Sequence, residues 1–358
     1  MSAVLPPAAR VSFVIATYQR VDALRSTLRA LQLQTCADWE AVVVGDCCAP
    51  DTGAMLAELA DARLRYYNLS ERFGEQSGPN SFGLALARAP VVCFLNHDDL
   101  LLPDHLELGL QRLEQSGADL LLAPALKLAT CHEAPDGSIR PVFMKRLTIG
   151  PELRDLRLLL RPEDLYYDPS SFWLVRTAYA RRVGPWIHSS RLWRTSLRDW
   201  LLRAWRLGGR FVFTPDLAGI RVVSHNHRGS RHRYNALTPE HQRLIRLFES
   251  LSPEQLRQRL PRKLRQTAAQ LGRPIGRRER PAALTPGLRL QALLYRLLGF
   301  DWQVLRWRRQ GVEPGAYHSR LLRQRTGETL ALVPDLARLL AEPERYREAS
   351  VPGSQQAR

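Results

Sequence analysis

The sequence predicts an α/β protein whose central sheet is mainly parallel and is flanked by helices. Three observations point to this class. Short β-rich runs alternate with helical patterns between residues 10 and 129, as in strand–helix–strand units. Most of these runs are continuously apolar, which is typical of strands buried on both faces. Polar side chains follow several of the runs, and a parallel sheet brings such strand ends to one edge.

Four strands are expected in the first 100 residues, at 11–17, 40–46, 63–69 and 90–96. The run at 63–69 is more polar than the others, so we place it nearer an edge of the sheet. Residues 118–129 (ADLLLAPALKLA) are expected to form a further buried strand.

Leucines at a helical spacing predict the helices between these strands. One set lies between the first two strands, and a second set follows Pro103 and stops before Gly117, a plausible helix end. We assign both stripes to core packing. Their members are Leu24, Leu28 and Leu31, then Leu106, Leu110 and Leu113.

The pattern is less regular beyond residue 130. A turn at Pro135-Asp136-Gly137 predicts a hairpin or excursion. Strand-like runs at 170–175 and 210–215 enclose a helix near 197–207, and residues 238–350 are mostly helical by pattern.

These patterns divide the chain into two regions. The first is an α/β domain over 1–237, with one half at about 10–129 and the other at about 130–237. The second is a basic helical C-terminal region over 238–358.

Composition excludes several classes of protein. The 358 residues are 45% hydrophobic and 24% charged, which is globular composition. No apolar run reaches the roughly 20 residues of a membrane-spanning helix. The N-terminus lacks the pattern of a secretory signal, and the five cysteines have no zinc spacing. We therefore expect free thiols and a cytoplasmic location.

Positive charge is concentrated in the C-terminal region. The formal net charge is +17, and residues 238–358 hold 23 Lys plus Arg against 11 Asp plus Glu. Such a surface favours phosphates, anionic lipid headgroups or nucleic acid. No nucleic-acid recognition motif accompanies the arginines, so nucleic acid is the weaker alternative.

Two adjacent carboxylates, Asp98 and Asp99, follow the strand at 90–96 directly. One of them could cap the next helix while the other is solvated. That helix starts only near Pro103, however, so capping suits Asp104 better. Two like charges at the edge of a sheet favour a cation, and hard oxygen ligands suit Mg²⁺ or Mn²⁺ bridging to a diphosphate.

The runs VSFVIATYQR, VVVGDCCAPDT and GPNSFGLALARAPVVCFLNHDDLLLPDHL resemble, in that order, the family 2 glycosyltransferases. The resemblance covers roughly residues 10–225. It implies the GT-A fold, which is Rossmann-like, and a nucleotide-diphospho-sugar donor.

The resemblance also implies the roles of individual residues at the donor site. Thr17 and the loop from Tyr18 to Arg20 would line the nucleotide pocket. Asp46 would accept a hydrogen bond from the base, uracil in a uridine-linked donor. Two further implied positions are Asn80 near the diphosphate and Asp98 at the ribose or the metal.

Asp99 would ligate the metal, Mn²⁺ or Mg²⁺. The sequence departs from the family pattern at two places close to these residues. Asn96 stands where many members have the first Asp of the motif, and Cys47-Cys48 follow Asp46. The second departure leaves the choice of base open.

Asp199 matches the general base of the family, in a Glu-Asp helix region where this chain has Arg198 in place of Glu. A base is needed to deprotonate the acceptor hydroxyl as it attacks the anomeric carbon. The alternative role for Asp199 is a helical ion pair with Arg203. Asp168 and Asp216 are the other candidate carboxylates.

A basic segment over 221–233 is interpreted as a loop that closes over the donor diphosphate. Arg221, Arg228 and His227 would contact the phosphates, because guanidinium groups match phosphate oxygens. His225 is a candidate metal ligand. A solvated basic loop is the alternative.

Tryptophans cluster where the family binds its acceptor. Indole rings stack on the apolar faces of sugars, so Trp173, Trp186 and Trp193 are candidate acceptor residues, whereas Trp200 and Trp205 suit the core better.

The sequence therefore predicts a metal-dependent inverting glycosyltransferase that uses a nucleotide-sugar, expected to be UDP-linked, and a hydroxyl acceptor of a bacterial surface glycan or glycolipid. A non-catalytic nucleotide-sugar-binding or assembly protein on the same fold is the alternative. Residues 288–309 mix Leu, Trp and Arg. They would either contact an anionic membrane at its inner face or pack on the protein.

Overall fold

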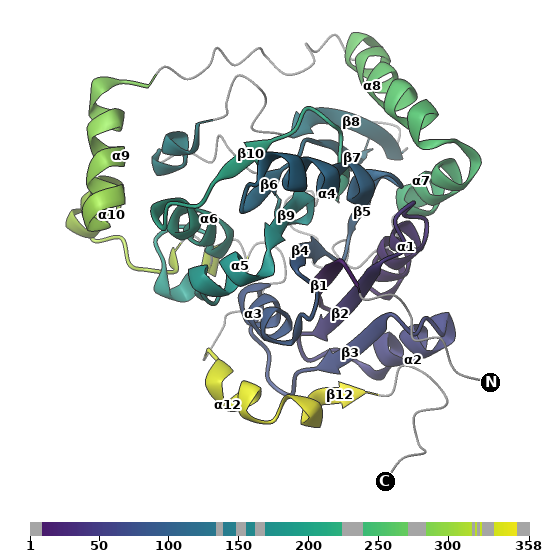
Figure 1. The fold of residues 1–358 in the computed structure, drawn as a ribbon, viewed down its shortest axis with the longest axis horizontal. Helices are drawn as coiled ribbons and strands as arrows, with labels where there is room; N and C mark the ends of the chain where they lie inside the picture. The colour runs from purple at the N-terminus through teal and green to yellow at the C-terminus, as the bar shows by residue number, and fades with distance from the viewer. Residues whose placement is uncertain are drawn as a thin grey trace.

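The structure is a computed structural model. It describes residues 9–133, 139–147, 155–161, 169–223, 239–270, 284–316, 319–320, 323 and 333–348. A large mixed sheet forms the centre of the molecule, and a smaller sheet lies beside it (Figure 1).

The large sheet has the strand order β10-β6-β9-β4-β1-β2-β3-β12. Its centre is parallel, because β1 pairs in parallel with both β2 and β4, and β2 pairs in parallel with β3. The strands β1, β2 and β4 are mainly apolar and buried on both faces, as the sequence predicts, whereas β3 (LRYYN) is more polar. Their bounds are β1 (Val11–Thr17), β2 (Trp39–Gly45), β3 (Leu64–Asn68) and β4 (Val91–Asn96).

Short strands complete the large sheet on both sides. The strand β9 (Trp173–Arg176) is antiparallel to β4 and to β6 (Leu120–Leu122), and β10 (Phe211–Phe213) is parallel to β6. At the other edge β12 (Arg347–Glu348) pairs antiparallel with β3. The predicted α/β class with a mainly parallel sheet is therefore confirmed, and β3 lies next to the edge strand.

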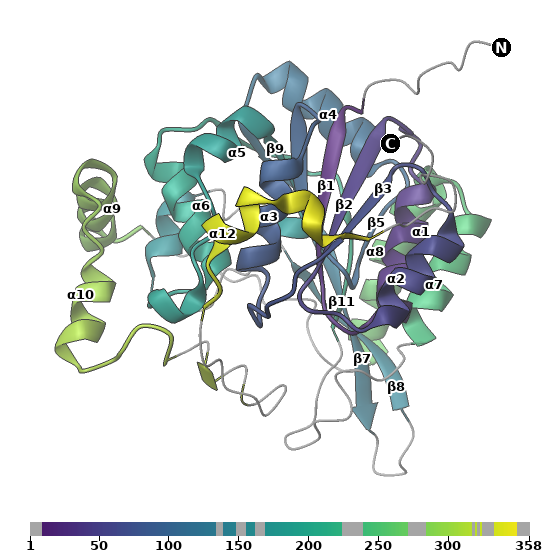
Figure 2. The ribbon, with the colours of Figure 1, turned by 90° about the horizontal axis from the view of Figure 1, so that it is seen from below.

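The smaller sheet has the order β5-β11-β7-β8. It starts at β5 (Asp99–Leu101), directly after β4, and contains β11 (Gly219–Val223). The strands β7 (Ala125–Glu133) and β8 (Ile139–Leu147) form an antiparallel pair that projects from the body of the molecule (Figure 2). The two strands of the hairpin expected around residue 136 are therefore present, and the turn at Pro135-Asp136-Gly137 lies outside the described residues.

Two expected strands differ from the structure. Residues 118–129 do not form one strand, because the chain leaves the large sheet after β6 and joins the smaller sheet at β7. Pro124 lies at this break, and proline cannot donate a ladder hydrogen bond. The run at 170–175 begins with a 3₁₀ turn, Ser170–Phe172, before β9.

Helices cover both faces of the large sheet. Leucines of α1 and α4 and Met55 and Leu56 of α2 form one buried cluster with β1 and β2. Residues of α3, α5 and α6 form another with Val14 and Phe94 on the opposite face. The helices are α1 (Val21–Gln32), α2 (Pro50–Leu59), α3 (Ser77–Leu86), α4 (His105–Ser116), α5 (Thr177–Val183) and α6 (Ser196–Arg206).

The C-terminal region packs in three places on this body. Leu244 and Phe248 of α7 (Pro239–Ser250), with leucines of α8 (Pro253–Gln270), bury the apolar side chains of the smaller sheet. The helices α9 (Pro286–Leu298) and α10 (Trp302–Arg309) lie beyond α6. The helix α12 (Leu336–Ala341) packs on α3 and leads to β12.

Among the described residues, no helix is long and apolar enough to cross a membrane. Cys36, Cys47, Cys48 and Cys93 are free thiols, as the sequence predicts.

Candidate active site

The carboxyl ends of β1, β2 and β4 meet at one edge of the large sheet, and this edge gathers the predicted donor-site residues. The backbone N–H of Asp46 donates to the carbonyl oxygen of Thr17 (2.9 Å), which joins the ends of β2 and β1. The backbone N–H of Tyr18 faces His97 Nδ1 (3.4 Å), which joins β1 to the end of β4. Thr17 is buried, and its hydroxyl has no hydrogen-bond partner among the residues that the structure describes.

Asp46 is a buried carboxylate that holds the loop after β3. Its two oxygens accept hydrogen bonds from the backbone N–H groups of Phe73 and Gly74, both at 2.7 Å. Burial raises the pKa of Asp46 to about 6, although these two bonds and the charge of Arg72 oppose the shift. The preceding Gly45 has no room for a side chain, because a Cβ atom there would lie 2.6 Å from Asn68 Oδ1.

Asp98 is the carboxylate of the pair that reaches the surface. Its side chain is 23% exposed, and its Oδ2 accepts a 2.6 Å hydrogen bond from Nη1 of the buried Arg20. Burial opposes the ionisation of Asp98, but the charges of Arg20, His97, His241 and Arg221 outweigh it and lower the pKa of Asp98. Asp98 is therefore an anion held in a fixed position at the edge of the sheet.

Asp99 does not take the exposed position that the resemblance implies for a metal ligand. It has no exposed surface, because β5 pairs with β11 at this residue. Its Oδ2 accepts hydrogen bonds from Ser171 Oγ (2.5 Å) and Asn96 Nδ2 (2.8 Å). Burial and the neighbouring charge of Asp98 raise the pKa of Asp99 to about 7. The buried Asp99 carboxylate thus stabilises the turn that follows β4, and Asp98 is the better candidate for a metal ligand.

Several residues that position this motif were missed by the sequence analysis. The hydroxyl of Thr27 donates to the carbonyl oxygens of His97 (2.9 Å) and Asp99 (3.2 Å). His241, a buried residue of α7, places Nε2 3.0 Å from the carbonyl oxygen of Asp98. Both contacts join residues that are far apart in the sequence, so no local sequence pattern predicts them.

The remaining predicted nucleotide-pocket residues lie around Asp46. The guanidinium of Arg72 stands 3.9 Å from the centre of the Tyr18 ring. Asn80 is buried in the first turns of α3, the helix that follows the loop held by Asp46. The structure therefore brings together Thr17, Tyr18, Arg20, Asp46 and Asp98, with Asn80 on the adjoining helix.

A chain of hydrogen bonds connects this edge with the start of α6. Glu75 Oε1, close to the Asp46 loop, accepts from the backbone N–H of Ser189 (2.8 Å). The hydroxyl of Ser189 in turn accepts from the backbone N–H of Ser196 (3.2 Å), the first residue of α6. The neighbouring His188 places Nε2 3.0 Å from the carbonyl oxygen of Phe73. The position of α6 is thus coupled to the donor-site loop.

Asp199 lies in the first turn of α6 and forms the helical ion pair that the sequence allows. Its Oδ2 accepts a 2.7 Å hydrogen bond from Nε of Arg203. Burial raises the pKa of Asp199, against the opposing charge of Arg203. Of the other candidate carboxylates, Asp216 pairs with Arg112 at the surface, and Asp168 lies outside the described residues.

Two of the predicted acceptor tryptophans are buried in the core. Trp173 is 0% and Trp186 is 4% exposed, and they stack with each other and with Trp200 at centroid distances of 5.6–6.4 Å. An acceptor sugar cannot reach rings that are packed in the core, so the expectation is wrong for both. Trp193 is partly exposed, and Arg308 covers its ring at 4.4 Å.

Arg221 lies on β11, where it is the register partner of Asp99. Its charge helps to lower the pKa of Asp98 and opposes the rise in the pKa of Asp99. The other residues of the predicted loop, namely His225, His227 and Arg228, lie outside the described residues.

The side chains at this edge fit a metal ion that takes most of its ligands from the substrate. Within the described ranges, no three His, Cys, Asp or Glu side chains gather as a metal cage. Mg²⁺ commonly takes only one or two carboxylates and completes its shell with phosphates and water. Asp98, ionised and partly exposed, supplies such a carboxylate.

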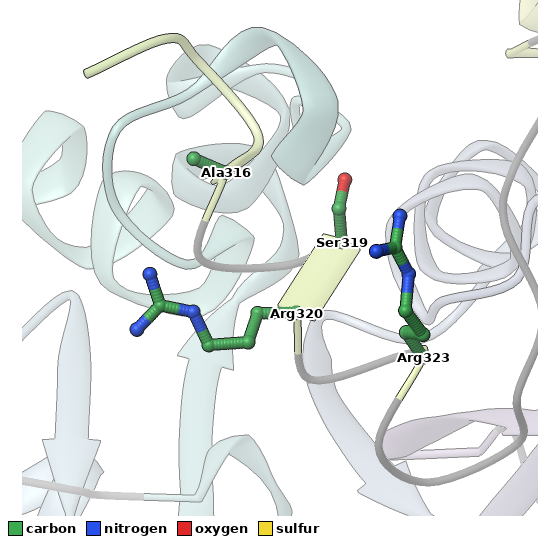
Figure 3. A pocket seen from close by; sticks show the side chains of 4 residues that line it. All are labelled: Ala316, Ser319, Arg320 and Arg323. Carbon is green, nitrogen blue, oxygen red and sulfur yellow. The ribbon is translucent and has the colours of Figure 1, made fainter. Parts of the chain in front are cut away.

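A cavity of about 410 Å³ lies beside the segment that leads into α6. It is lined by Ala316, Ser319, Arg320 and Arg323, and the two arginines extend on either side of Ser319 (Figure 3). Gly315, which precedes the lining residue Ala316, is held against the segment before α6, because its backbone N–H donates to the carbonyl oxygen of Leu192 (2.8 Å). Two guanidinium groups at one cavity suit an anionic ligand.

Comparison with known proteins gives a match to one family model. Residues 12–184 match the model described as Glycosyl transferase family 2. The succinoglycan biosynthesis protein ExoO of Rhizobium meliloti is 32% identical over 110 residues, which cover 31% of this chain and 31% of ExoO. The uncharacterized glycosyltransferase YwdF of Bacillus subtilis is 26% identical over 149 residues, which cover 42% of this chain and 53% of YwdF.

The chain thus spans about a third of one curated relative and about half of the other. Among solved structures, residues 1–349 of S. aureus TarS in complex with UDP-GlcNAc align with a TM-score of 0.46 at 16% identity, covering 94% of this chain and 91% of that one.

Proposed function

The chain carries a family 2 glycosyltransferase domain over residues 12–184, and on this premise we propose that it is an inverting glycosyltransferase. It would transfer a sugar from a nucleoside-diphosphate sugar, uridine-linked, to an acceptor hydroxyl. The observation that carries the proposal is the partly exposed, ionised Asp98 at the carboxyl edge of the sheet, next to Asp46 and the Tyr18 loop.

The arrangement of this edge supports a proposal for how the donor binds. We propose that the base lies by Asp46 and Tyr18 and that the diphosphate extends toward Asp98 and Arg221. Asp98 would hold Mn²⁺ or Mg²⁺, which neutralises the charge of the departing nucleoside diphosphate. Arg20 fixes the Asp98 carboxylate by its 2.6 Å contact, so the ligand is in place before the donor arrives.

We assign the general base to Asp199. Burial raises its pKa, which makes the carboxylate a better proton acceptor near neutral pH. Its Oδ2 is engaged by Arg203, so Oδ1 is the atom that would take the proton of the acceptor hydroxyl. The contacts through Ser189 and Glu75 couple the helix that bears this base to the donor-site loop.

We place the acceptor beside residues 188–196 and the cavity of Ala316, Ser319, Arg320 and Arg323. The two arginines favour an acceptor that carries a phosphate or another anionic group. A lipid-linked glycan of a bacterial surface polymer is such an acceptor, and it would place the reaction at the inner face of a membrane.

A panel of thermal unfolding measurements tests the donor site. UDP, GDP, CDP, ADP and dTDP are each added with and without Mn²⁺, because a ligand of the native state raises the melting temperature by mass action. We expect metal-dependent stabilisation by UDP that is lost in Asp98→Asn. Asp51→Asn, which removes an exposed carboxylate on α2, is the matched control. Stabilisation by no nucleotide would overturn the proposal.

Activity measurements separate an enzyme from a non-catalytic binding protein on the same fold. Hydrolysis or transfer of the UDP-sugar identified by this panel is followed for the wild type and Asp199→Asn. We expect the variant to lose about 10²–10⁴-fold in turnover while it keeps the nucleotide-dependent thermal shift. Asp216→Asn is the control and should retain turnover. Nucleotide binding without any turnover would favour the binding protein.

A further inference from the structure

The helix α9 is apolar on two opposite sides, and one of them packs on the protein. Leu288, Ala292 and Tyr295 are buried in the cluster that includes α6 and residues 156–160. Tyr295 also stacks on Trp205, with ring centroids 6.2 Å apart. This inner side fixes α9 to the body of the molecule.

The outer side of α9 carries leucines that the described protein leaves exposed. Leu290, Leu293 and Leu297 are 57%, 54% and 68% exposed. At 3.6 residues per turn they lie on the side of the helix opposite to its buried residues. Large apolar side chains gathered on one exposed face mark an interaction surface.

The apolar surface continues past the end of α9. Leu298 is 71%, Phe300 37% and Trp302 50% exposed, and the rings of Phe300 and Trp302 meet edge to face at 5.9 Å. Figures 1 and 2 both place α9 and α10 at the outer margin of the molecule, beyond α6. We call these six residues the outer apolar surface: Leu290, Leu293, Leu297, Leu298, Phe300 and Trp302.

Arginines surround this surface. Arg289 and Arg296 are exposed on α9, and Arg306, Arg308 and Arg309 are exposed on α10. Residues 286–309 contain a single acidic residue, Asp301, and Arg194 binds its carboxylate at 2.8 Å. The surface is therefore apolar at its centre and positively charged around it.

We propose that the outer apolar surface docks on an anionic lipid bilayer, with α9 lying in the interface plane. Leucines on one face, arginines beside them and an aromatic pair at one end are the features of interfacial helices, and aromatic rings favour the headgroup level. The 13 residues of α9 extend only about 20 Å, so the helix lies on a bilayer rather than crossing it.

A second copy of the chain fits this surface less well. A twofold contact would bring the same residues of both copies together. The arginines of one copy would then face those of the other, which is unfavourable, whereas an anionic leaflet supplies opposite charge. The inference needs no transferase activity, so it stands apart from the proposed function.

Vesicle flotation of the full chain tests the proposal. The vesicles contain phosphatidylcholine with phosphatidylglycerol, whose anionic headgroups give the leaflet a negative surface potential, and pure phosphatidylcholine serves for comparison. We expect binding to the anionic vesicles that weakens as salt rises. Leu293→Ser combined with Leu297→Ser should weaken it at least about tenfold, because two leucines leave the acyl boundary.

Charge variants provide the matched control. Arg306→Gln with Arg309→Gln should weaken vesicle binding, whereas Arg259→Gln with Arg262→Gln, which removes the same charge from exposed positions on α8, should leave it nearly unchanged. Unaltered melting temperatures establish that the variants are folded.

Three results would overturn the proposal. The first is no binding of the wild type to the anionic vesicles. The second is equal loss in both charge variants with no effect of the leucine variant, which indicates unspecific attraction. The third is a wild-type dimer in sedimentation that the leucine variant dissociates, without vesicle binding, which assigns the surface to a second copy.

Discussion

Adjacent carboxylates of one motif do different work in this protein. Asp98 is partly exposed and paired with Arg20, whereas Asp99 is fully buried and bound by Ser171 and Asn96. The difference follows from the start of β5, which turns the second side chain inward. The two residues are adjacent in the sequence motif, but the backbone points their side chains in different directions and so gives them different roles.

The pair gives a first prediction at the scale of residues. Asp98→Asn should abolish the Mn²⁺-dependent part of the nucleotide thermal shift. It should also cost about 1–3 kcal/mol of unfolding free energy, because Arg20 loses a charged partner. Asp99→Asn keeps an oxygen for Ser171 and Asn96 and should leave the metal-dependent shift in place. Thermal unfolding with and without UDP and Mn²⁺ measures both, and equal loss in the two variants would contradict the division of roles.

A second residue-scale prediction concerns His105, which is buried at the start of α4 and whose Nε2 has no hydrogen-bond partner in the described part of the chain. Burial lowers the pKa of His105 to about 4, and the charge of Arg257 adds to the effect. The unfolded chain binds a proton near pH 6.5 and the folded chain does not. Stability contributed by neutral His105 is therefore present above pH 6.5 and is lost as the pH falls toward 4.

The measurement is the free energy of unfolding between pH 7 and pH 5 for the wild type and His105→Gln. We expect the wild type to lose about 1–2 kcal/mol more than the variant over this interval, since one pKa unit corresponds to about 1.4 kcal/mol. Parallel curves for the two proteins would show that His105 does not titrate in this way.

At the scale of elements, the end of the chain protects the edge of the large sheet. The strand β12 pairs with β3, and Leu339 of α12 is 0% exposed in a cluster with Tyr67 and Phe82. Arg338 forms an ion pair with Glu71 in the same region. Exposed edge strands invite pairing with other chains, so this cover has a protective role.

We predict that Leu339→Ala lowers the free energy of unfolding by about 2–4 kcal/mol, the range for a buried leucine. Leu340→Ala is the matched control, because its neighbouring leucine is only partly buried, and it should cost less than half as much. Chemical denaturation of both variants provides the values. Equal costs would mean that α12 is not anchored through Leu339.

Helices and strands could be predicted where the local sequence pattern determines them. They could not be predicted where packing between distant segments determines them. The strand at 11–17 is found at those residues because a continuous apolar run is bounded by polar ones. The run at 118–129 hides a change of sheet at Pro124. The edge that holds Asp46 and Asp98 follows from topology alone, but Ser171 and His241 reach the motif over 72 and 143 residues. The tryptophans failed as acceptor residues because composition does not reveal which rings stack in the core.

At the scale of the whole molecule, the C-terminal region completes the body in separate places. Phe248 of α7 and Leu256 and Leu260 of α8 cover the smaller sheet, and α9 contributes to the cluster around α6. We therefore predict that residues 1–237 alone bind a hydrophobic dye and aggregate, since the fragment exposes several buried clusters. Size-exclusion chromatography of the fragment beside the full chain measures this. A monomeric fragment with a cooperative melting transition would contradict the prediction.

The pairing of β3 with β12 also sets an order of events during synthesis. The end of β3 at Asn68 and the start of β12 at Arg347 are 279 positions apart. At roughly 5–20 residues per second, a ribosome needs about 15 to 55 s to travel between them. For that interval the outer side of β3 has no native neighbour, although β2, which pairs with its other side, is already synthesised. The outer edge of β3 therefore stays unpaired in the nascent chain during this interval, and this is when a chaperone that shields the edge is most needed.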